Sequence, residues 1–205
     1  MGYTDLIEGS KCMDEVSMLI PSNDFEPMIN GMELDDESEN MKLYSKLMKI
    51  SKSIKLHSYG GTFDIIVYGD KYVLLNHDDA MVDYYVKVDE RNYKAIGKWS
   101  CQVEVWRRLM SPKTGIVSFM FDNYILPKHG TVISDSMQTK MGKSMWAKLA
   151  YHAFDKNRYV YGYDGNTGKL SRFMDSSDFS RKVRTYYGTE KKFSQLRLVI
   201  SNNKL

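Results

Sequence analysis

The chain has 205 residues, of which 42% are hydrophobic and 27% charged, a composition typical of a globular domain with a sizeable core. Its two cysteines, Cys12 and Cys101, argue against a disulfide scaffold and a cysteine-based zinc site and favour a reducing cytoplasm. No stretch approaches the roughly 18 apolar residues of a membrane helix, and the N-terminus lacks the pattern of a signal peptide. We therefore expect a cytoplasmic protein that has no membrane partner.

A strong charge asymmetry lies beneath the small net charge of +3. Residues 1–40 contain eleven Asp and Glu against a single Lys, a net charge of −10, whereas the remaining residues carry +13. This division predicts an acidic N-terminal arm over 1–40, extended or partly helical, and one domain over 41–205. The basic body favours an anionic partner, namely nucleic acid, a phosphorylated cofactor or its own arm; the alternative is a solvated surface.

The first predicted helix begins near residues 35–38, where acidic side chains cluster as a helix N-terminus favours. Apolar residues then recur at helical spacing, at Met41, Tyr44, Leu47 and Met48. From residue 62 the period changes to that of strands. Residues 62–68 and 71–76 form two predicted strands around a tight turn at Gly69, and 81–88 and 99–109 form two more.

The next segment alternates helices with strands. Ser111 followed by Pro112 predicts a helix start, and this helix is expected to end before Pro127, although its β-branched content leaves a strand as the alternative. A strand over 131–134, a helix over 138–154, a strand over 158–164 and a last strand over 196–200 follow. This order predicts an α+β fold with a mixed, mostly antiparallel sheet flanked by helices.

The string Gly142-Lys143-Ser144 follows a strand, as the end of a nucleotide-binding P-loop does. The first glycine of that motif would fall at position 137, which is occupied by Met137, a residue that takes a positive φ only at a cost. The glycine–lysine pair therefore belongs to the helix over 138–154. The predicted apolar face of this helix comprises Met145, Trp146, Leu149, Ala150 and Ala153.

Histidines give no sign of a metal site, because the four of them share no ligand spacing. A cation at His77-Asp78-Asp79 competes with the reading of these residues as a solvated turn. From Lys140 onward the chain carries 14 Lys and Arg against 5 acids, with five tyrosines interleaved: Tyr159, Tyr161, Tyr163, Tyr186 and Tyr187. Such a region is able to grip nucleic acid through phosphates and stacking; the alternatives are a coenzyme-binding face or an interface for the acidic arm.

The segment from Gln102 to about Gly165 resembles the GNAT acyltransferase superfamily. In that fold a central strand leads to a pyrophosphate-binding turn and helix, a splayed strand, another helix and a closing strand. Here those parts fall to "QVEVWRR", "LMSPKTG" with its helix, "TVISD", "MGKSMWAKLAYHAF" and "RYVYGYD". The late helix is similar to the family pattern of small residue, aromatic, charge and Lys-Leu. The strings also resemble small acyltransferase-like proteins of tailed bacteriophages.

This resemblance implies an acyl-CoA cofactor, acetyl-CoA or another, and an amine substrate. The pyrophosphate would meet the turn before the helix, where amides are exposed. The residues implied there are Arg108, Ser111, Lys113, Thr114 and Gly115. Glu104 would deprotonate the amine; the alternative is a solvent-facing strand residue paired to Arg107 or a lysine. Ser134, Asp135 and Trp146 would lie on the substrate side.

Two departures from the family pattern keep a second function open. "SPKTG" holds one glycine at a different spacing, and Trp146 stands where a Tyr often protonates the leaving thiolate. Tyr151, on another face of the helix, is a partial substitute. The first hypothesis is an acyl-CoA-dependent N-acyltransferase. The second is an inactive GNAT-like phage protein that binds a host protein or nucleic acid, or serves in a virion.

Overall fold

The computed structural model describes residues 36–51, 57–59, 61–93, 96, 98–108, 115–134, 140–187 and 196–205. The chain divides into two compact units, Met1–Lys87 with Val105–Pro112, and Val88–Glu104 with Lys113–Leu205. Strands β4 (Met81–Tyr93) and β5 (Lys98–Arg107) contribute residues to both units. Most of the predicted acidic arm lies outside the described residues, and helix α3 begins at Glu37.

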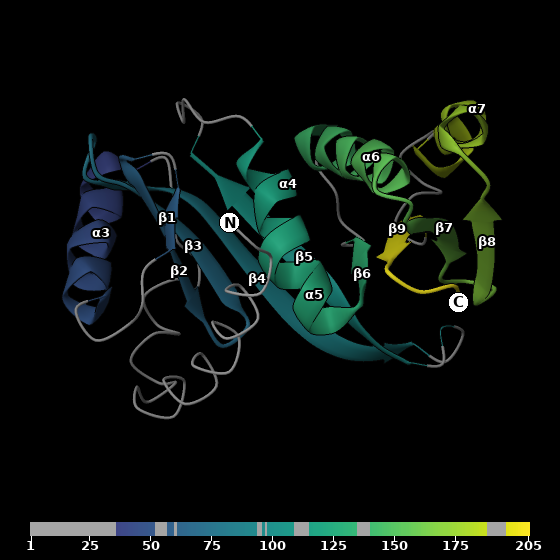
Figure 1. Ribbon diagram of the computed structural model, residues 1–205, viewed down its shortest axis with the longest axis horizontal. Helices are drawn as coiled ribbons and strands as arrows, with labels where there is room; N and C mark the ends of the chain where they lie inside the picture. The colour runs from purple at the N-terminus through teal and green to yellow at the C-terminus, as the bar shows by residue number, and fades with distance from the viewer. Residues whose placement is uncertain are drawn as a thin grey trace, which may run out of the picture. The chain divides into compact units, whose positions relative to one another are not determined.

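The first unit contains α3 (Glu37–Ser51), β1 (His57–Tyr59), β2 (Phe63–Tyr68), β3 (Lys71–Asn76) and the start of β4. These four strands are neighbours in chain order, and successive strands are antiparallel (Figure 1). The predicted turn between β2 and β3 is confirmed, since Gly69 has a φ of 56° there. The short β1 was not predicted from the sequence.

Helix α3 buries Leu47 as predicted, with Tyr44 and Met48 half-buried, but Met41 departs from the predicted stripe. Asn40, Leu43 and Leu47 are buried at i, i+3 and i+7, whereas Met41 is 48% exposed, so its assignment to the inward face is wrong. The reason is a polar residue in the apolar stripe. Asn40 is fully buried because its amide is hydrogen-bonded to strand β4, and this turns the helix away from Met41.

Strand β4 carries one extra residue relative to β3. Leu74 pairs with Tyr84 but Leu75 pairs with Val82, so Asp83 stands as a β-bulge. The Asp83 carbonyl accepts a hydrogen bond of 3.1 Å from the backbone N–H of Arg108, directly after β5. The bulge thus places a fully buried carboxylate beside the end of β5.

The second unit contains eleven elements in its described residues. They are parts of β4 and β5, then α4 (Ile116–Met120), the π-helical turn η1 (Phe121–Ile125), α5 (Leu126–His129), β6 (Thr131–Ser134), α6 (Lys140–Asp155), β7 (Tyr159–Asp164), β8 (Lys169–Phe173), α7 (Ser176–Tyr187) and β9 (Leu196–Ser201). From β5 the strand order is β5-β6-β9-β7-β8. The β5–β6 pair is parallel, and the β6–β9, β9–β7 and β7–β8 pairs are antiparallel. The predicted mixed, mostly antiparallel α+β fold is confirmed.

The helical run after β5 is described from Ile116, directly after Gly115, whose φ of 79° is not helical. The predicted start at Ser111-Pro112 lies outside the described residues. The run continues through Pro127 to His129 instead of ending before the proline. The turn before Pro127 is π-helical, with the Leu126 N–H bonded to the Phe121 carbonyl, so the missing proline N–H falls where the helix already changes its hydrogen-bond pattern.

Helix α6 packs as its sequence predicts. Trp146, Leu149, Ala150 and Ala153 are buried, and Ser144, Lys148 and Asp155 on the opposite face are exposed. The Trp146 ring packs edge-on against Phe121 of η1, with centroids 5.6 Å apart at 88°. Strand β8 and helix α7 were not predicted. The bounds of β6 agree with the prediction.

Candidate functional site

The predicted coenzyme site surrounds the parallel pair of strands in the second unit. Cys101, Gln102 and Val103 of β5 pair with Val132, Ile133 and Ser134 of β6. Beyond Ser134 the chain leaves the described residues until α6 begins at Lys140. The order strand, helical run, parallel strand, helix, strand is therefore present, and a divergence of the two strands past Ser134 stays a prediction.

Only part of the predicted site can be placed. Glu104 lies in β5, immediately after the last residue paired to β6. The structure does not describe the placement of its side chain. Ser111, Lys113, Thr114 and Asp135 also lie outside the described residues. Gly115 is placed at the N-terminus of the helical run, and as a glycine it has no side chain of its own to cap the first backbone N–H groups. Such a terminus presents donors and a positive dipole end to an anion.

Two of the residues predicted on the substrate side are buried in the unit. Ser134 has no exposed surface, and its Oγ accepts a hydrogen bond of 3.0 Å from the Leu198 N–H of β9. Trp146 is 1% exposed and packs on Phe121. In this conformation both residues belong to the buried core. A substrate would contact them only if the residues that cover them moved.

Tyr151, the predicted substitute for the missing acid, faces helix α7. Its hydroxyl is 2.7 Å from the Ser180 Oγ, and its ring packs edge-on against Phe179 with centroids 5.2 Å apart. The side chain is 39% exposed. The phenol therefore serves the α6–α7 contact, and nothing among the described residues turns it toward Ser134.

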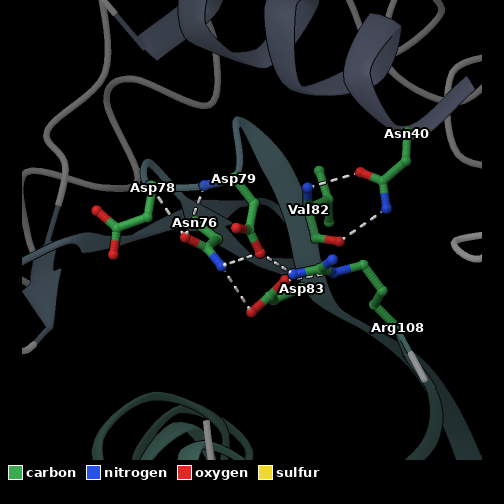
Figure 2. Close-up of polar contacts among 7 residues, drawn as sticks. All are labelled: Asn40, Asn76, Asp78, Asp79, Val82, Asp83 and Arg108. Carbon is green, nitrogen blue, oxygen red and sulfur yellow. Dashed lines mark hydrogen bonds and ion pairs between the residues drawn. The ribbon is translucent and has the colours of Figure 1, made fainter. Parts of the chain in front are cut away.

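Arg108, predicted to hold the pyrophosphate, lies in the first unit and engages two carboxylates (Figure 2). Its Nε donates to Asp83 at 2.7 Å, and one terminal nitrogen donates to Asp79. Burial lowers the pKa of Arg108, but the hydrogen bonds and charges of the two carboxylates outweigh that effect and raise it. The Arg108 side chain is only 11% exposed, and its guanidinium is paired with two carboxylates of this unit.

Two asparagines complete this polar network. Asn76 donates to Asp79 and Asp83 at 3.1 and 3.2 Å, and its own oxygen accepts the backbone N–H groups of Asp78 and Asp79. Asn40 of α3 bonds both backbone groups of Val82, donating to the carbonyl at 2.9 Å and accepting from the N–H at 2.6 Å. Figure 2 shows the Asn40 amide lying against β4 as a neighbouring strand would. Sequence reasoning missed this network, because its members are far apart along the chain.

A second missed cluster connects α3, β2 and the β3–β4 turn. The Tyr44 hydroxyl is 2.7 Å from His77 Nδ1, and His77 Nε2 is 2.8 Å from Asp64 Oδ2. Burial, followed by the charge of Asp64, raises the pKa of Tyr44. His77 also shares the turn expected to be solvated or to bind a cation.

In the second unit, Asp122 of η1 receives His152 and Arg158. His152 Nε2 is 2.7 Å from Asp122 Oδ2, and the Arg158 guanidinium bonds the other carboxylate oxygen. This cluster ties η1 to the end of α6. Among the described residues no group of three or more His, Cys, Asp or Glu side chains is arranged to hold a metal ion. Within the same residues, no helix is long and apolar enough to cross a membrane.

The tyrosines expected to stack on nucleic acid bases are partly withdrawn from the surface. Tyr161 and Tyr163 are 3% and 9% exposed and belong to a core cluster with Ile96, Ile133 and Val199. The prediction that these two rings stack on bases is wrong, because a base can stack only on a ring with an accessible face, and both rings are buried. Tyr159 carries the Arg172 guanidinium over its ring, 4.8 Å from the centroid.

Comparison with known proteins adds little. No family model matches the chain, and no curated protein matches it. One solved structure that it resembles is described as a "putative phosphinothricin N-acetyltransferase", with 10% identity, 84% of this chain and 96% of that chain covered, and a TM-score of 0.35. A likeness of this strength carries no argument about fold or activity, so the function has to be argued from the chain's own residues.

Proposed function

We propose that the second unit binds an acyl-CoA and transfers its acyl group to an amine, as GNAT enzymes do. The observation that supports this most is the parallel β5–β6 pair, joined by a segment whose helical run begins directly after Gly115. A strand–turn–helix–strand arrangement with parallel strands places the helix N-terminus at the carboxyl ends of the strands. A pyrophosphate is the kind of anion that such a terminus favours.

In this proposal the chain's residues have distinct roles. The backbone N–H groups that follow Gly115 hold the pyrophosphate, with Ser111, Lys113 and Thr114 of the preceding turn adding donors and charge. Glu104, which follows the last paired residue of β5, takes the proton of the attacking amine. Arg108 is not assigned a contact with the coenzyme, because its guanidinium is bonded to Asp79 and Asp83.

The proposal is tested by calorimetric titration of the full chain with acetyl-CoA and, separately, with acetyl-pantetheine. We expect binding of acetyl-CoA that weakens strongly for acetyl-pantetheine, which lacks the pyrophosphate. Replacing Glu104→Gln should leave this binding within about twofold and reduce the release of free thiol during turnover by 10²-fold or more, as loss of a general base does. Absence of binding heat with acetyl-CoA would remove the enzyme reading.

A second candidate function is a GNAT-like module that binds another protein without catalysis. The observation that favours it is the pair of aromatic residues on α6: Trp146 is enclosed in the core, and the Tyr151 hydroxyl is paired to Ser180. Neither is presented as a proton donor. This candidate predicts acetyl-CoA binding without thiol release for any amine, or no binding at all.

A further inference from the structure

The cluster of Tyr44, His77 and Asp64 has the geometry of an activated nucleophile. Side-chain nucleophiles are recognised by a base within about 2.6–3.2 Å and by a third group that orients the base. Here the phenol lies 2.7 Å from the imidazole, and the imidazole lies 2.8 Å from the carboxylate on its far side. All three residues belong to the first unit, apart from the predicted coenzyme site.

Protonation of the ring follows from the partners. A carboxylate only accepts hydrogen bonds, so His77 Nε2 must carry a proton to bond Asp64. In the neutral ring Nδ1 is then left without a proton and accepts the Tyr44 O–H. The phenol hydrogen therefore points at a base that is held in the tautomer able to receive it.

The backbone fixes this arrangement. Tyr44 follows the buried Leu43 on α3, and the His77 N–H donates to the Thr62 carbonyl at 2.9 Å at the start of β2. The two rings meet edge to face, with centroids 5.9 Å apart and planes at 73°. The site remains accessible, because the side chains of His77 and Asp64 are 28% and 18% exposed.

We propose that Tyr44, His77 and Asp64 form a second reactive site, in which the Tyr44 hydroxyl accepts an acyl group from an uncharged activated ester or thioester. The phenol oxygen attacks the carbonyl carbon while His77 Nδ1 takes the phenol proton. The bond from the carbonyl carbon to the leaving oxygen or sulfur then breaks, and His77 returns the proton to the leaving group. The products are an aryl ester at Tyr44 and one alcohol or thiol, with no change of oxidation state.

Two features of the surroundings fit this reaction. A phenol of ordinary pKa is already protonated at neutral pH, and burial and the Asp64 charge raise the pKa of Tyr44 further, so the reaction requires the His77 base. The Asp64 carboxylate on the far side of the ring also stabilises the imidazolium that forms when the proton moves. The same negative charge disfavours anionic substrates such as phosphate esters, which is why an uncharged ester is the expected acyl donor.

The test uses p-nitrophenyl acetate with the full chain, following p-nitrophenolate release and mapping the acetylated peptides by mass spectrometry. We expect Tyr44 to be acetylated fastest, and Tyr44→Phe to remove that product. His77→Gln should slow acetylation of Tyr44 by about 10²-fold, the lower end of what a general base contributes. The matched control is Tyr151, an exposed tyrosine whose hydroxyl pairs with the Ser180 hydroxyl and not with a histidine.

Chemical rescue separates a base from a merely structural histidine. In His77→Gly, added imidazole should raise the ratio of Tyr44 to Tyr151 acetylation; the ratio is the readout, because imidazole also forms N-acetylimidazole, which acetylates any exposed tyrosine. Circular dichroism confirms that each variant is folded, and the ratio of Tyr44 to Tyr151 labelling in the unmodified chain is decisive without any variant. Equal labelling of the two tyrosines, or a Tyr44 rate that His77→Gln leaves unchanged, would overturn the proposal.

Discussion

The two units attach their helices to their strands by different means. In the first unit, α3 is held by the Asn40 amide on Val82 and by the Tyr44–His77 contact, in addition to Leu43 and Leu47. In the second, α6 is held by an apolar face centred on Trp146. The difference teaches that the apolar face by which a helix packs can be predicted from the periodicity of its sequence. Polar contacts of a helix depend on distant partners, which the sequence does not reveal.

The largest effect is expected where the attachment is apolar. Trp146→Ala should lower the free energy of unfolding by about 4 kcal/mol, because it leaves a cavity against Phe121. Urea denaturation measures this loss. Trp106→Ala is the control: that ring is 39% exposed, so its loss should cost clearly less. Equal losses would mean that the α6 face is not the centre of its unit.

The polar network should respond almost as strongly to loss of a charge. Asp83→Ala leaves the Arg108 guanidinium without its buried partner, and we expect a loss of about 3 kcal/mol in urea denaturation. The double variant Asp83→Ala with Arg108→Met should recover part of that loss, since no buried charge is then left unpaired. Glu39→Ala, which breaks the exposed pair with Lys42, should change stability by less than about 0.5 kcal/mol. A loss of stability in Asp83→Ala as small as that in Glu39→Ala would contradict the buried pairing of Asp83 with Arg108.

Loss of the two Asn40–Val82 hydrogen bonds is expected to lower the free energy of unfolding less than loss of the Asp83–Arg108 ion pair. Asn40→Ala strips the Val82 N–H and carbonyl of their partners, and we expect destabilisation of about 2 kcal/mol by chemical denaturation. Asn123→Ala serves as the matched control, because its amide makes one exposed hydrogen bond to the Phe119 carbonyl. If the two asparagines prove equivalent, the Asn40 amide does not help to hold α3.

The smallest effect concerns a surface charge cluster on α7. Hydrogen bonds from Lys182 and Arg181 lower the pKa of Asp178 from 3.8 to about 2. A lowered folded-state pKa means that this contribution to stability is present above about pH 4 and is lost as the pH falls toward 2. Asp178→Asn should therefore flatten the decline of the melting temperature over that range. An unchanged slope in Asp178→Asn would refute the linkage.

Much of the fold could be predicted from local patterns. The bounds of β3 and β6 and the buried face of α6 follow from period and composition. The positive φ of Gly115, directly before α4, could not be predicted, because it is visible only in the folded chain. Pro127 misled, since the π-helical turn before it is a tertiary outcome.

Less of the site could be predicted. The sequence singled out Arg108 as a charge near the turn, but could not show that Asp79 and the bulged Asp83 occupy it. Tyr161 and Tyr163, in a basic part of the sequence, were expected to stack on bases. Their burial with Val199 depends on the position of β9 between β6 and β7 in the sheet. The Tyr44–His77–Asp64 cluster has no sequence signature, because its members lie on three different elements.

The most direct test of the proposed function compares two glycines in the second unit. Gly115 and Gly168 have φ values of 79° and 69°, and a Cβ at either position meets nothing within 4 Å. Alanine at either should therefore bring a similar backbone strain, on the order of 1 kcal/mol. In calorimetric titration with acetyl-CoA, we predict that Gly115→Ala weakens binding about tenfold, roughly the affinity equivalent of 1.4 kcal/mol, while Gly168→Ala binds as the unmodified chain does. No binding by any of the three proteins, or equal weakening by both alanines, would contradict the proposed coenzyme site.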